Sequence, residues 1–242
     1  MKIVFSWDDG ALEDQKLFEL HEKYSIPGMF FVPTYNREER KVLTPYMLRN
    51  AKSENIFFGG HTFRHTYLTD ICIEGVDVEI LNNKKYLEDC LGYSIDHFCL
   101  PGGKYNSEVL KKVFKYFSTV RTAETMNFYN DCNILRPSLH FYPRGIKSLI
   151  FNALLHNSYG ELIQLLSNMN LNYFDLMKKI IDFESTKEMS QVLIWGHSWE
   201  IEENGLWDNL DMLFEYISVN YLSSCVKYDD LHCSDIMKSG SV

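Results

Sequence analysis

The sequence predicts an α/β protein built on one largely parallel sheet, with its active site at the carboxyl ends of the strands. Two observations lead to this prediction. Apolar segments of strand length alternate along the chain with segments whose apolar residues recur at helical spacing. Unusual polar residues stand directly after several of these strands, at the edge where parallel sheets gather their chemistry. The alternation itself is compatible with an open sheet and with a closed barrel.

Length and composition are those of a single ordered domain, residues 1–242. A chain of 242 residues and 28.5 kDa can bury one sizeable core, and its 45% hydrophobic and 24% charged residues are typical of globular proteins. The net charge of −9 argues against a nucleic-acid partner, because binding to phosphates rests on clustered cations. We interpret the basic run of Lys111, Lys112 and Lys115 as a solvated helix face.

The sequence also predicts a cytoplasmic protein without a membrane span. No apolar run approaches the roughly 18 residues that a span needs. The N-terminus enters an apolar strand at Ile3 and meets Asp8 soon after, which is too short for the core of an export signal. The six cysteines include no Cys-x-x-Cys pair, and without an export signal we expect free thiols.

The first third of the chain predicts three strands and two helices. Residues 2–7 and 29–32 have the apolar character of buried strands, and a helical repeat lies between them. Thr44-Pro45 predicts a helix start, because the threonine hydroxyl can cap free amides and proline fits the first turn. A strand at residues 56–58 then leads into Gly59-Gly60.

The remainder of the chain continues the alternation without an internal repeat or linker. Four further strands are predicted at residues 96–100, 118–122, 134–142 and 192–196. Helices are predicted near residues 75–91, 109–117 and 210–217. The segment 144–190 is predicted to be mostly helical, and we favour a structural role for it over a lid or a dimer contact.

The first strand ends in Asp8-Asp9-Gly10. Adjacent side chains on a regular strand point to opposite faces, so the two carboxylates can converge only where the strand ends. Gly10 gives the backbone the freedom for that turn. Taken alone, Asp-Asp-Gly is more often a simple turn, so the functional interpretation depends on other residues.

Two further segments supply those residues. His61 and His65 follow the third strand, and histidines at positions i and i+4 share one face if a helical turn forms there. The strand 192–196 delivers His197, which on its own could be a core histidine. Two histidines and one carboxylate leave metal positions open for water and substrate, as catalytic metal sites do. The second carboxylate and the third histidine are then available as base and acid.

These residues resemble the motifs of the polysaccharide deacetylases, the NodB-homology carbohydrate esterases. Ser-Trp-Asp-Asp-Gly is similar to the family's first motif, Thr-Phe-Asp-Asp-Gly, and His-Thr-Phe-Arg-His matches its second, His-Ser/Thr-x-x-His. Leu193-Ile194-Trp195-Gly196-His197 is similar to the fifth, Leu-x-Leu-x-His, with Trp195 in place of the second leucine. The matches occur in the family's order across residues 5–199.

The resemblance implies a distorted, incomplete (β/α) barrel of about seven strands. It also implies that Asp9, His61 and His65 bind a divalent metal ion, expected to be Zn²⁺. Asp8 is then the general base and His197 the general acid. The implied reaction releases acetate from an N-acetylated sugar, which a nucleotide, a lipid or a short glycan could carry.

Two departures from the family pattern bear on this site. The third motif is commonly Arg-x-Pro-x-Gly, and here Cys99 takes the place of the arginine, while Pro101 and Gly103 are kept. By position, Gly102 would give the oxyanion amide, although Pro-Gly-Gly is also an ordinary turn. The fourth motif, Asp-x-x-x-Trp, is not found, and its region holds Asp131.

Another cation is therefore expected beside the base. Arg121 ends one predicted strand and Arg136 begins the next, and we slightly prefer Arg136 as the partner of Asp8. For either arginine, the alternative is an ordinary surface ion pair. Leu193 and Trp195 of the fifth motif are assigned to contact with the substrate.

The sequence supports three functions. The first is a sugar N-deacetylase. The second is a hydrolase with the same metal site and another amide substrate, such as a sugar N-formyl group or a small cyclic amide. The third is a catalytically silent relative that binds a glycan or a metal ion, and the presence of all five motif residues weighs against it. The oligomeric state is left open.

Overall fold

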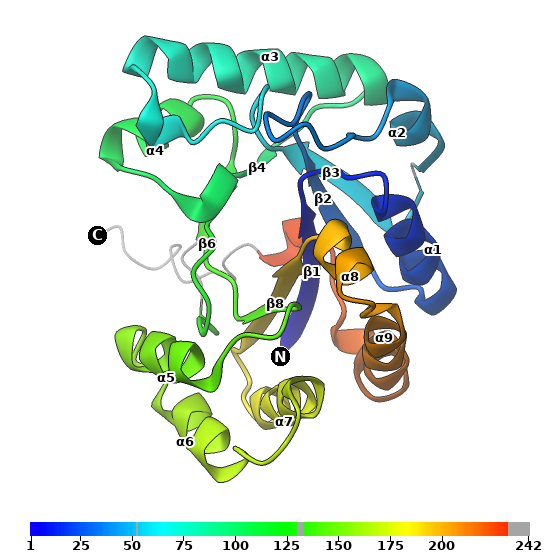
Figure 1. Ribbon diagram of the computed structural model, residues 1–242, viewed down its shortest axis with the longest axis vertical. Coiled ribbons are helices and arrows are strands. Elements are labelled where there is room, and N and C mark those ends of the chain that lie inside the picture. The colour runs from blue at the N-terminus through cyan, green and yellow to red at the C-terminus, as the bar shows by residue number, and fades with distance from the viewer. Residues whose placement is uncertain (52, 130–132, 232–242) are drawn as a thin grey trace, which may run out of the picture.

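The computed structural model describes residues 1–51, 53–129 and 133–231 and contains an eight-stranded parallel sheet that curls into a distorted barrel (Figure 1). The strands are β1 (Lys2–Asp8), β2 (Gly28–Val32), β3 (Ile56–Gly60), β4 (His97–Cys99), β5 (Thr119–Arg121), β6 (Ile134–Leu135), β7 (Leu139–His140) and β8 (Gln191–Gly196). Their order across the sheet is β6-β5-β4-β3-β2-β1-β8-β7. The predicted fold class is confirmed, with eight strands where about seven were expected.

The additional strand arises in the segment 134–142, where the prediction of one continuous strand is wrong. Pro137 has no backbone N–H to give to a ladder, and the N–H of Ser138 donates to the Leu193 carbonyl oxygen on β8 at 2.8 Å. The chain therefore leaves one edge of the sheet at β6 and joins the other edge at β7.

The short connection between β6 and β7 forces the sheet to curl. Leu135 ends β6 and Leu139 begins β7, and four Cα steps span at most about 15 Å. The two edges of the sheet must therefore lie close together although no ladder joins them. The barrel closes through the covalent chain and not through hydrogen bonds between strands.

Helices surround this sheet on its outer side (Figure 1). They are α1 (Asp14–Tyr24), α2 (Pro45–Ala51), α3 (Ile73–Leu91), α4 (Ser107–Val113), α5 (Ile146–Leu155), α6 (Tyr159–Ser167), α7 (Tyr173–Ser185), α8 (Ser198–Glu203) and α9 (Trp207–Tyr221). The predicted start of α2 is confirmed, because the Met47 N–H donates to Thr44 Oγ1 at 3.3 Å. The predicted helical segment 144–190 forms α5, α6 and α7.

The strands alternate between two apolar layers, and this alternation defines the inside of the barrel. Ile3, Phe5 and Trp7 on β1 belong to the large core that packs against the helices. Val4 belongs to a second, smaller cluster. This inner cluster draws residues from five strands and two residues from the C-terminal segment: Val4, Met29, Phe31, Cys99, Leu135, Leu193, Trp195, Tyr228 and Leu231. It fills the barrel interior as the packed layers of such barrels do.

Two general properties of the described residues complete the fold. Cys72, Cys90, Cys99 and Cys225 are free thiols, as predicted, while Cys132 and Cys233 lie outside the described residues. Among the helices that the structure describes, none combines the length and the apolar character that crossing a membrane requires.

Candidate metal and catalytic site

The polar residues predicted to form the site lie at the carboxyl ends of neighbouring strands, in the top layer of the barrel interior. Side chains alternate along a strand, so Asp8 lies on the same inner face of β1 as Val4. By the same alternation, His197 follows Trp195 to the inside at the end of β8. The alternation of side chains along the strands thus places polar residues at the carboxyl end of the barrel interior and apolar residues in the layers below.

The two carboxylates at the end of β1 converge through a left-handed turn. Asp8 is the last residue of the strand, and Asp9 and Gly10 follow with φ of 74° and 57°. A side chain at Gly10 would approach Val32 Cγ1 to 2.6 Å, so glycine is needed where the turn contacts β2. This is the strand-end geometry that the Asp-Asp-Gly sequence predicts.

The loop after β3 brings His61 and His65 together without the helical turn that their spacing would favour. Thr62 and His65 have positive φ of 66° and 53°, and the ring centroids of the two histidines lie 5.0 Å apart. The backbone N–H groups go to other partners, since Phe63 donates to the Glu79 carbonyl oxygen at 2.9 Å. A left-handed loop therefore does what a helix was expected to do.

Asp9, His61 and His65 form a buried group whose ligand atoms lie within 4.8 Å of one another. Asp9 Oδ1 lies 3.4 Å from His61 Nε2 and 3.0 Å from His65 Nε2. Asp9 Oδ2 accepts the indole N–H of Trp199 at 2.9 Å, which directs the other oxygen toward the histidines. Burial alone would raise the pKa of Asp9, but the two imidazoles hold it well below its ordinary value.

The protons around this group indicate that it suits a metal ion. His61 Nδ1 lies 2.9 Å from the Cys99 carbonyl oxygen, which can only accept, so Nδ1 carries the proton and Nε2 keeps its lone pair. That lone pair faces the Asp9 carboxylate. His65 Nδ1 is buried without a hydrogen-bond partner among the described residues. Two nitrogen atoms and one oxygen atom that face one another fit Zn²⁺ or a similar divalent ion.

Asp8 is held by a buried cation. Arg121 Nη2 donates to Asp8 Oδ1, and Arg121 Nη1 donates to the Thr122 carbonyl oxygen at 2.8 Å. The guanidinium also stacks over Trp195, with its Cζ 4.8 Å from the ring centroid. Burial alone would raise the pKa of Asp8, but Arg121 and the nearby histidines hold it below its ordinary value. Asp8 is therefore ionised near neutral pH, as a base must be.

The arginine beside Asp8 is Arg121 and not the slightly preferred Arg136. Arg136 Nε pairs with Glu124 at 3.0 Å instead. Arg121 is the last residue of β5, and the strand alternation that brings Cys99 inward on neighbouring β4 also brings Arg121 inward. A guanidinium is long enough to reach Asp8 from there.

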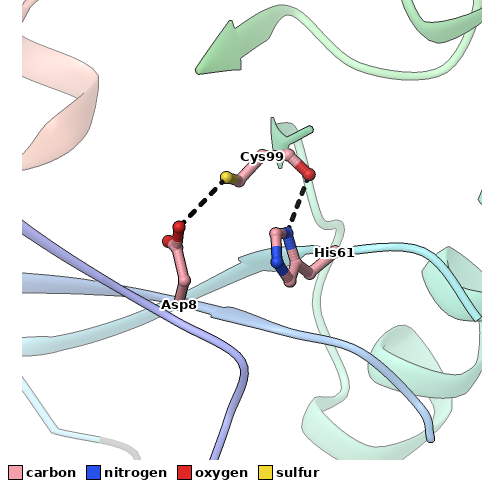
Figure 2. A group of neighbouring side chains, drawn as sticks. All are labelled: Asp8, His61 and Cys99. Carbon is pink, nitrogen blue, oxygen red and sulfur yellow. Dashed lines mark hydrogen bonds between the residues drawn. The ribbon is translucent and has the colours of Figure 1, made fainter. Parts of the chain in front are cut away.

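Cys99 stands beside this ion pair as a neutral thiol. Figure 2 shows its sulfur directed at Asp8 and its carbonyl oxygen directed at the His61 ring. The Sγ–Oδ2 distance is 3.5 Å, a weak donor contact. Burial raises the pKa of Cys99 well above its ordinary value, and Asp8 adds to the effect. Because Asp8 is paired with Arg121 and His61 Nε2 faces Asp9, we assign the metal to Asp9, His61 and His65 and not to Asp8, His61 and Cys99.

His197 lies across the cavity and is held through its Nδ1 atom. Nδ1 lies 2.7 Å from Glu200 Oε2, which leaves Nε2 for a substrate. The same Glu200 oxygen lies 3.2 Å from Nε2 of the buried His140 on β7. Burial lowers the pKa of His197, but Glu200 and the two aspartates outweigh burial and raise it.

A cavity of about 220 Å³ joins these groups. Besides the acidic and histidine residues, its walls include Tyr67, Gly102, Trp195 and Trp199. Leu193 lies one layer deeper in the barrel and is not among the lining residues, so the structure does not bring it to the cavity as expected. Gly102 lines the cavity with φ of 62°, and Asp131 lies outside the described residues. A separate cavity of about 280 Å³ near His97 contains none of the motif residues.

Residues 1–117 match the sequence model of the family described as polysaccharide deacetylase. A peptidoglycan-N-acetylglucosamine deacetylase from Bacillus cereus is 28% identical over 111 residues, which are 45% of this chain and 50% of that protein. Residues 1–117 are therefore similar to the polysaccharide deacetylase family. The family match contains Asp8, Asp9, His61 and His65, while His197 lies beyond it. The chain spans about half the length of the curated relative.

Solved structures of the family share the fold over nearly the whole chain. A peptidoglycan N-acetylglucosamine deacetylase in complex with a substituted benzamide has a TM-score of 0.59 and 13% identity, over 97% of this chain and 89% of that one. A family 4 acetyl xylan esterase from Clostridium thermocellum, in complex with a cobalt ion, has a TM-score of 0.57 and 12% identity, over 96% and 90%. A pseudoenzyme from Bacillus anthracis also has this fold, with a TM-score of 0.54, 10% identity and coverage of 91% and 62%.

Three residues at this deacetylase-like site were missed by sequence reasoning. Glu200 follows His197 by three positions at the start of α8, and that spacing could have indicated a contact. His140 lies in a segment predicted as a single strand, whose break hid which side chains turn inward. Asn83 accepts the His61 N–H at 2.9 Å from the middle of α3, and nothing in the local sequence marks it.

Proposed function

We propose that this protein is a divalent-metal-dependent hydrolase that removes the acetyl group from an N-acetylated sugar. The observation that carries the proposal is the convergence of a metal-type group, an ionised aspartate and a carboxylate-bound histidine on one cavity. The similarity of residues 1–117 to the polysaccharide deacetylase family supports deacetylase-like hydrolysis. The acetamido sugar as substrate is our inference.

The chain's own residues fit the steps of amide hydrolysis. A divalent ion held by Asp9, His61 and His65 would polarise the substrate carbonyl and acidify water. Asp8, kept ionised by Arg121, takes the proton of the attacking water. The Gly102 amide is proposed to stabilise the oxyanion, since this residue lines the same cavity. His197 gives its Nε2 proton to the departing amine.

The walls of the cavity suit a sugar ring. Tyr67, Trp195 and Trp199 contribute aromatic surface beside the polar groups, and binding sites commonly combine such walls with a few placed polar atoms. We consider three classes of substrate that carry such a sugar: a nucleotide sugar, a lipid-linked sugar and a short oligosaccharide.

The deciding experiment measures acetate release by the metal-reconstituted full chain. Chitin oligomers, a nucleotide-linked N-acetylglucosamine and a lipid-linked N-acetylglucosamine serve as substrates, and the His61→Ala/His65→Ala variant is the matched control. We expect wild-type acetate release that chelation abolishes and added Zn²⁺ restores. Acetate release that survives both chelation and the double substitution would contradict the proposal.

The alternative functions give different products in the same assay. An N-formyl sugar that yields formate faster than its N-acetyl counterpart yields acetate would move the proposal to a deformylase. Ring opening of a small cyclic amide without acetate release would identify a cyclic amidase. Metal or glycan binding without turnover of any of these substrates would identify a silent relative.

A further inference from the structure

A general acid at the end of β8 needs a group that fixes its ring. His197 directly follows β8, and its ring must present Nε2 to the cavity during proton transfer. An imidazole can rotate about its χ angles and exchange its proton between two nitrogens. A positioned acceptor on Nδ1 removes both freedoms, because it selects the ring orientation and requires a proton on Nδ1.

Glu200 has the geometry for this task. His197 precedes α8 as its N-cap residue, and Glu200 is the third residue of the helix, so the first helical turn brings the two side chains together. Nδ1 and Oε2 lie 2.7 Å apart, within the range of charge-assisted hydrogen bonds. Burial alone would raise the pKa of Glu200, but the two neighbouring histidines hold it far below its ordinary value. The carboxylate is therefore ionised and acts as an acceptor.

His140 packs beside this carboxylate on the other side. Its Nε2 lies 3.2 Å from the same oxygen of Glu200, and its Nδ1 lies 3.2 Å from the Tyr142 carbonyl oxygen. The ring packs edge-on against Trp195, with centroids 4.3 Å apart. His140 is buried on β7, so it belongs to the rigid wall of the barrel. Glu200 is thus bracketed by two imidazoles, one on the wall and one at the cavity.

We propose that Glu200 is the positioning residue of the proton donor His197. The proposal rests on the proposed function, since it assigns a role within that reaction. His197 directly follows β8, and Glu200 lies three residues later in α8. The same short helix also holds a metal ligand, because Trp199 donates to Asp9.

The test compares substrates that differ in their need for a proton. Glu200→Gln and Glu200→Ala are assayed as metal-reconstituted full chains on a chitin oligomer and on p-nitrophenyl acetate, whose phenolate leaves without protonation. We expect kcat on the amide to fall about 10–100-fold, with KM within about threefold, as for other groups that orient a reacting residue. Turnover of the aryl ester should stay within about threefold of wild type.

Glu202→Gln is the matched control. Glu202 lies on the same helix, is exposed and pairs with Lys16 at 2.6 Å, so its loss should leave both reactions unchanged. Retention of amide turnover within about threefold in both Glu200 variants would overturn the proposal. Equal losses on the amide and the aryl ester would overturn it as well, because they would indicate general structural damage.

A second measurement does not depend on turnover. Isotope-edited NMR of the His197 ring, assigned with His197→Ala, reports which nitrogen is protonated in wild type and in Glu200→Ala. We expect protonated Nδ1 in wild type and a mixture of tautomers in the variant. Identical ring signals in both proteins would overturn the positioning role. Wild-type protein without any hydrolysis would instead contradict the proposed function, and the NMR result would still decide the contact.

Discussion

The metal half and the proton-transfer half of the site are built in different ways. Asp9, His61 and His65 come from two strand ends within the first 65 residues, and short motifs in the sequence specify them. Asp8 and His197 also belong to motifs, but the groups that hold them come from β5 and α8. The ligands are local in sequence, whereas the supports are assembled only by the closed barrel.

The difference follows from what each half requires. A metal ion needs ligand atoms within a few tenths of an ångström, which leaves little freedom in where they are attached. A supporting charge needs only to reach a carboxylate or an imidazole, and a long side chain can do this from a neighbouring strand. Arg121 on β5 thus serves Asp8 although Cys99 on β4 carries no charge. Substitutions should therefore affect metal content in one half and proton transfer in the other.

The largest expected effect is the loss of the metal half. The His61→Ala/His65→Ala variant should lose its bound ion and more than the roughly 10²–10⁴-fold in kcat that a missing acid or base costs. Metal analysis and acetate release check this, with His156→Ala as a control that lies outside the site. Full metal occupancy in the double variant would remove the distinction between the two halves.

A smaller effect is expected for Asp8→Asn in the proton-transfer half. The variant should keep its metal ion and lose about 10²–10⁴-fold in kcat, because an amide cannot take the proton from water. It also leaves the buried Arg121 without its carboxylate, so denaturant unfolding should show a loss of up to about 3–5 kcal/mol. Turnover within about threefold of wild type would show that Asp8 is not the base.

The two arginines give a sharper test of the supporting charges. Arg121→Met should lower kcat by about 10–100-fold with little change in metal content. Arg136→Met should leave kcat unchanged and lower the free energy of unfolding by at most about 1 kcal/mol. Arg121→Lys keeps the charge but loses the planar fork, and it serves if the methionine variant does not fold. Equal kinetics for the Arg121 and Arg136 variants would contradict the assignment of Arg121 to Asp8.

The smallest effect on the site is expected for a substitution of Asn83, which accepts the backbone N–H of His61. Asn83 is fully buried, and its amide donates to the Val32 carbonyl oxygen at 3.0 Å. Asn83→Ala should cost about 1–3 kcal/mol of stability and weaken metal binding by about tenfold. Asn82→Ala, an exposed neighbour on α3, should stay within about 0.5 kcal/mol of wild type. Thermal unfolding with and without chelator separates the two contributions.

The sequence predicted more of this site than of its supports. Apolar periodicity gave the strands and helices, and polar residues at strand ends indicated Asp8, Asp9, His61, His65 and His197. Prediction from the sequence failed where contacts between distant segments decide which side chains meet. Which of the two arginines contacts Asp8 depends on which side chains of β4 and β5 point inward. Whether Leu193 contacts a substrate depends on which layer of the barrel it fills. Asn83 could not be found because its partners lie 22 and 51 residues away in the chain.

The seam between β6 and β7 has a dynamic consequence. Each of these two-residue strands is hydrogen-bonded to a neighbour on one side only, whereas β1 is bonded to β2 and to β8. Local opening costs less free energy where fewer hydrogen bonds break. Amide hydrogen–deuterium exchange should therefore be fastest along the seam and slowest along β1. Since Arg121 lies on β5, next to β6, local opening of the seam would loosen the support of Asp8 before it disturbs the metal ligands.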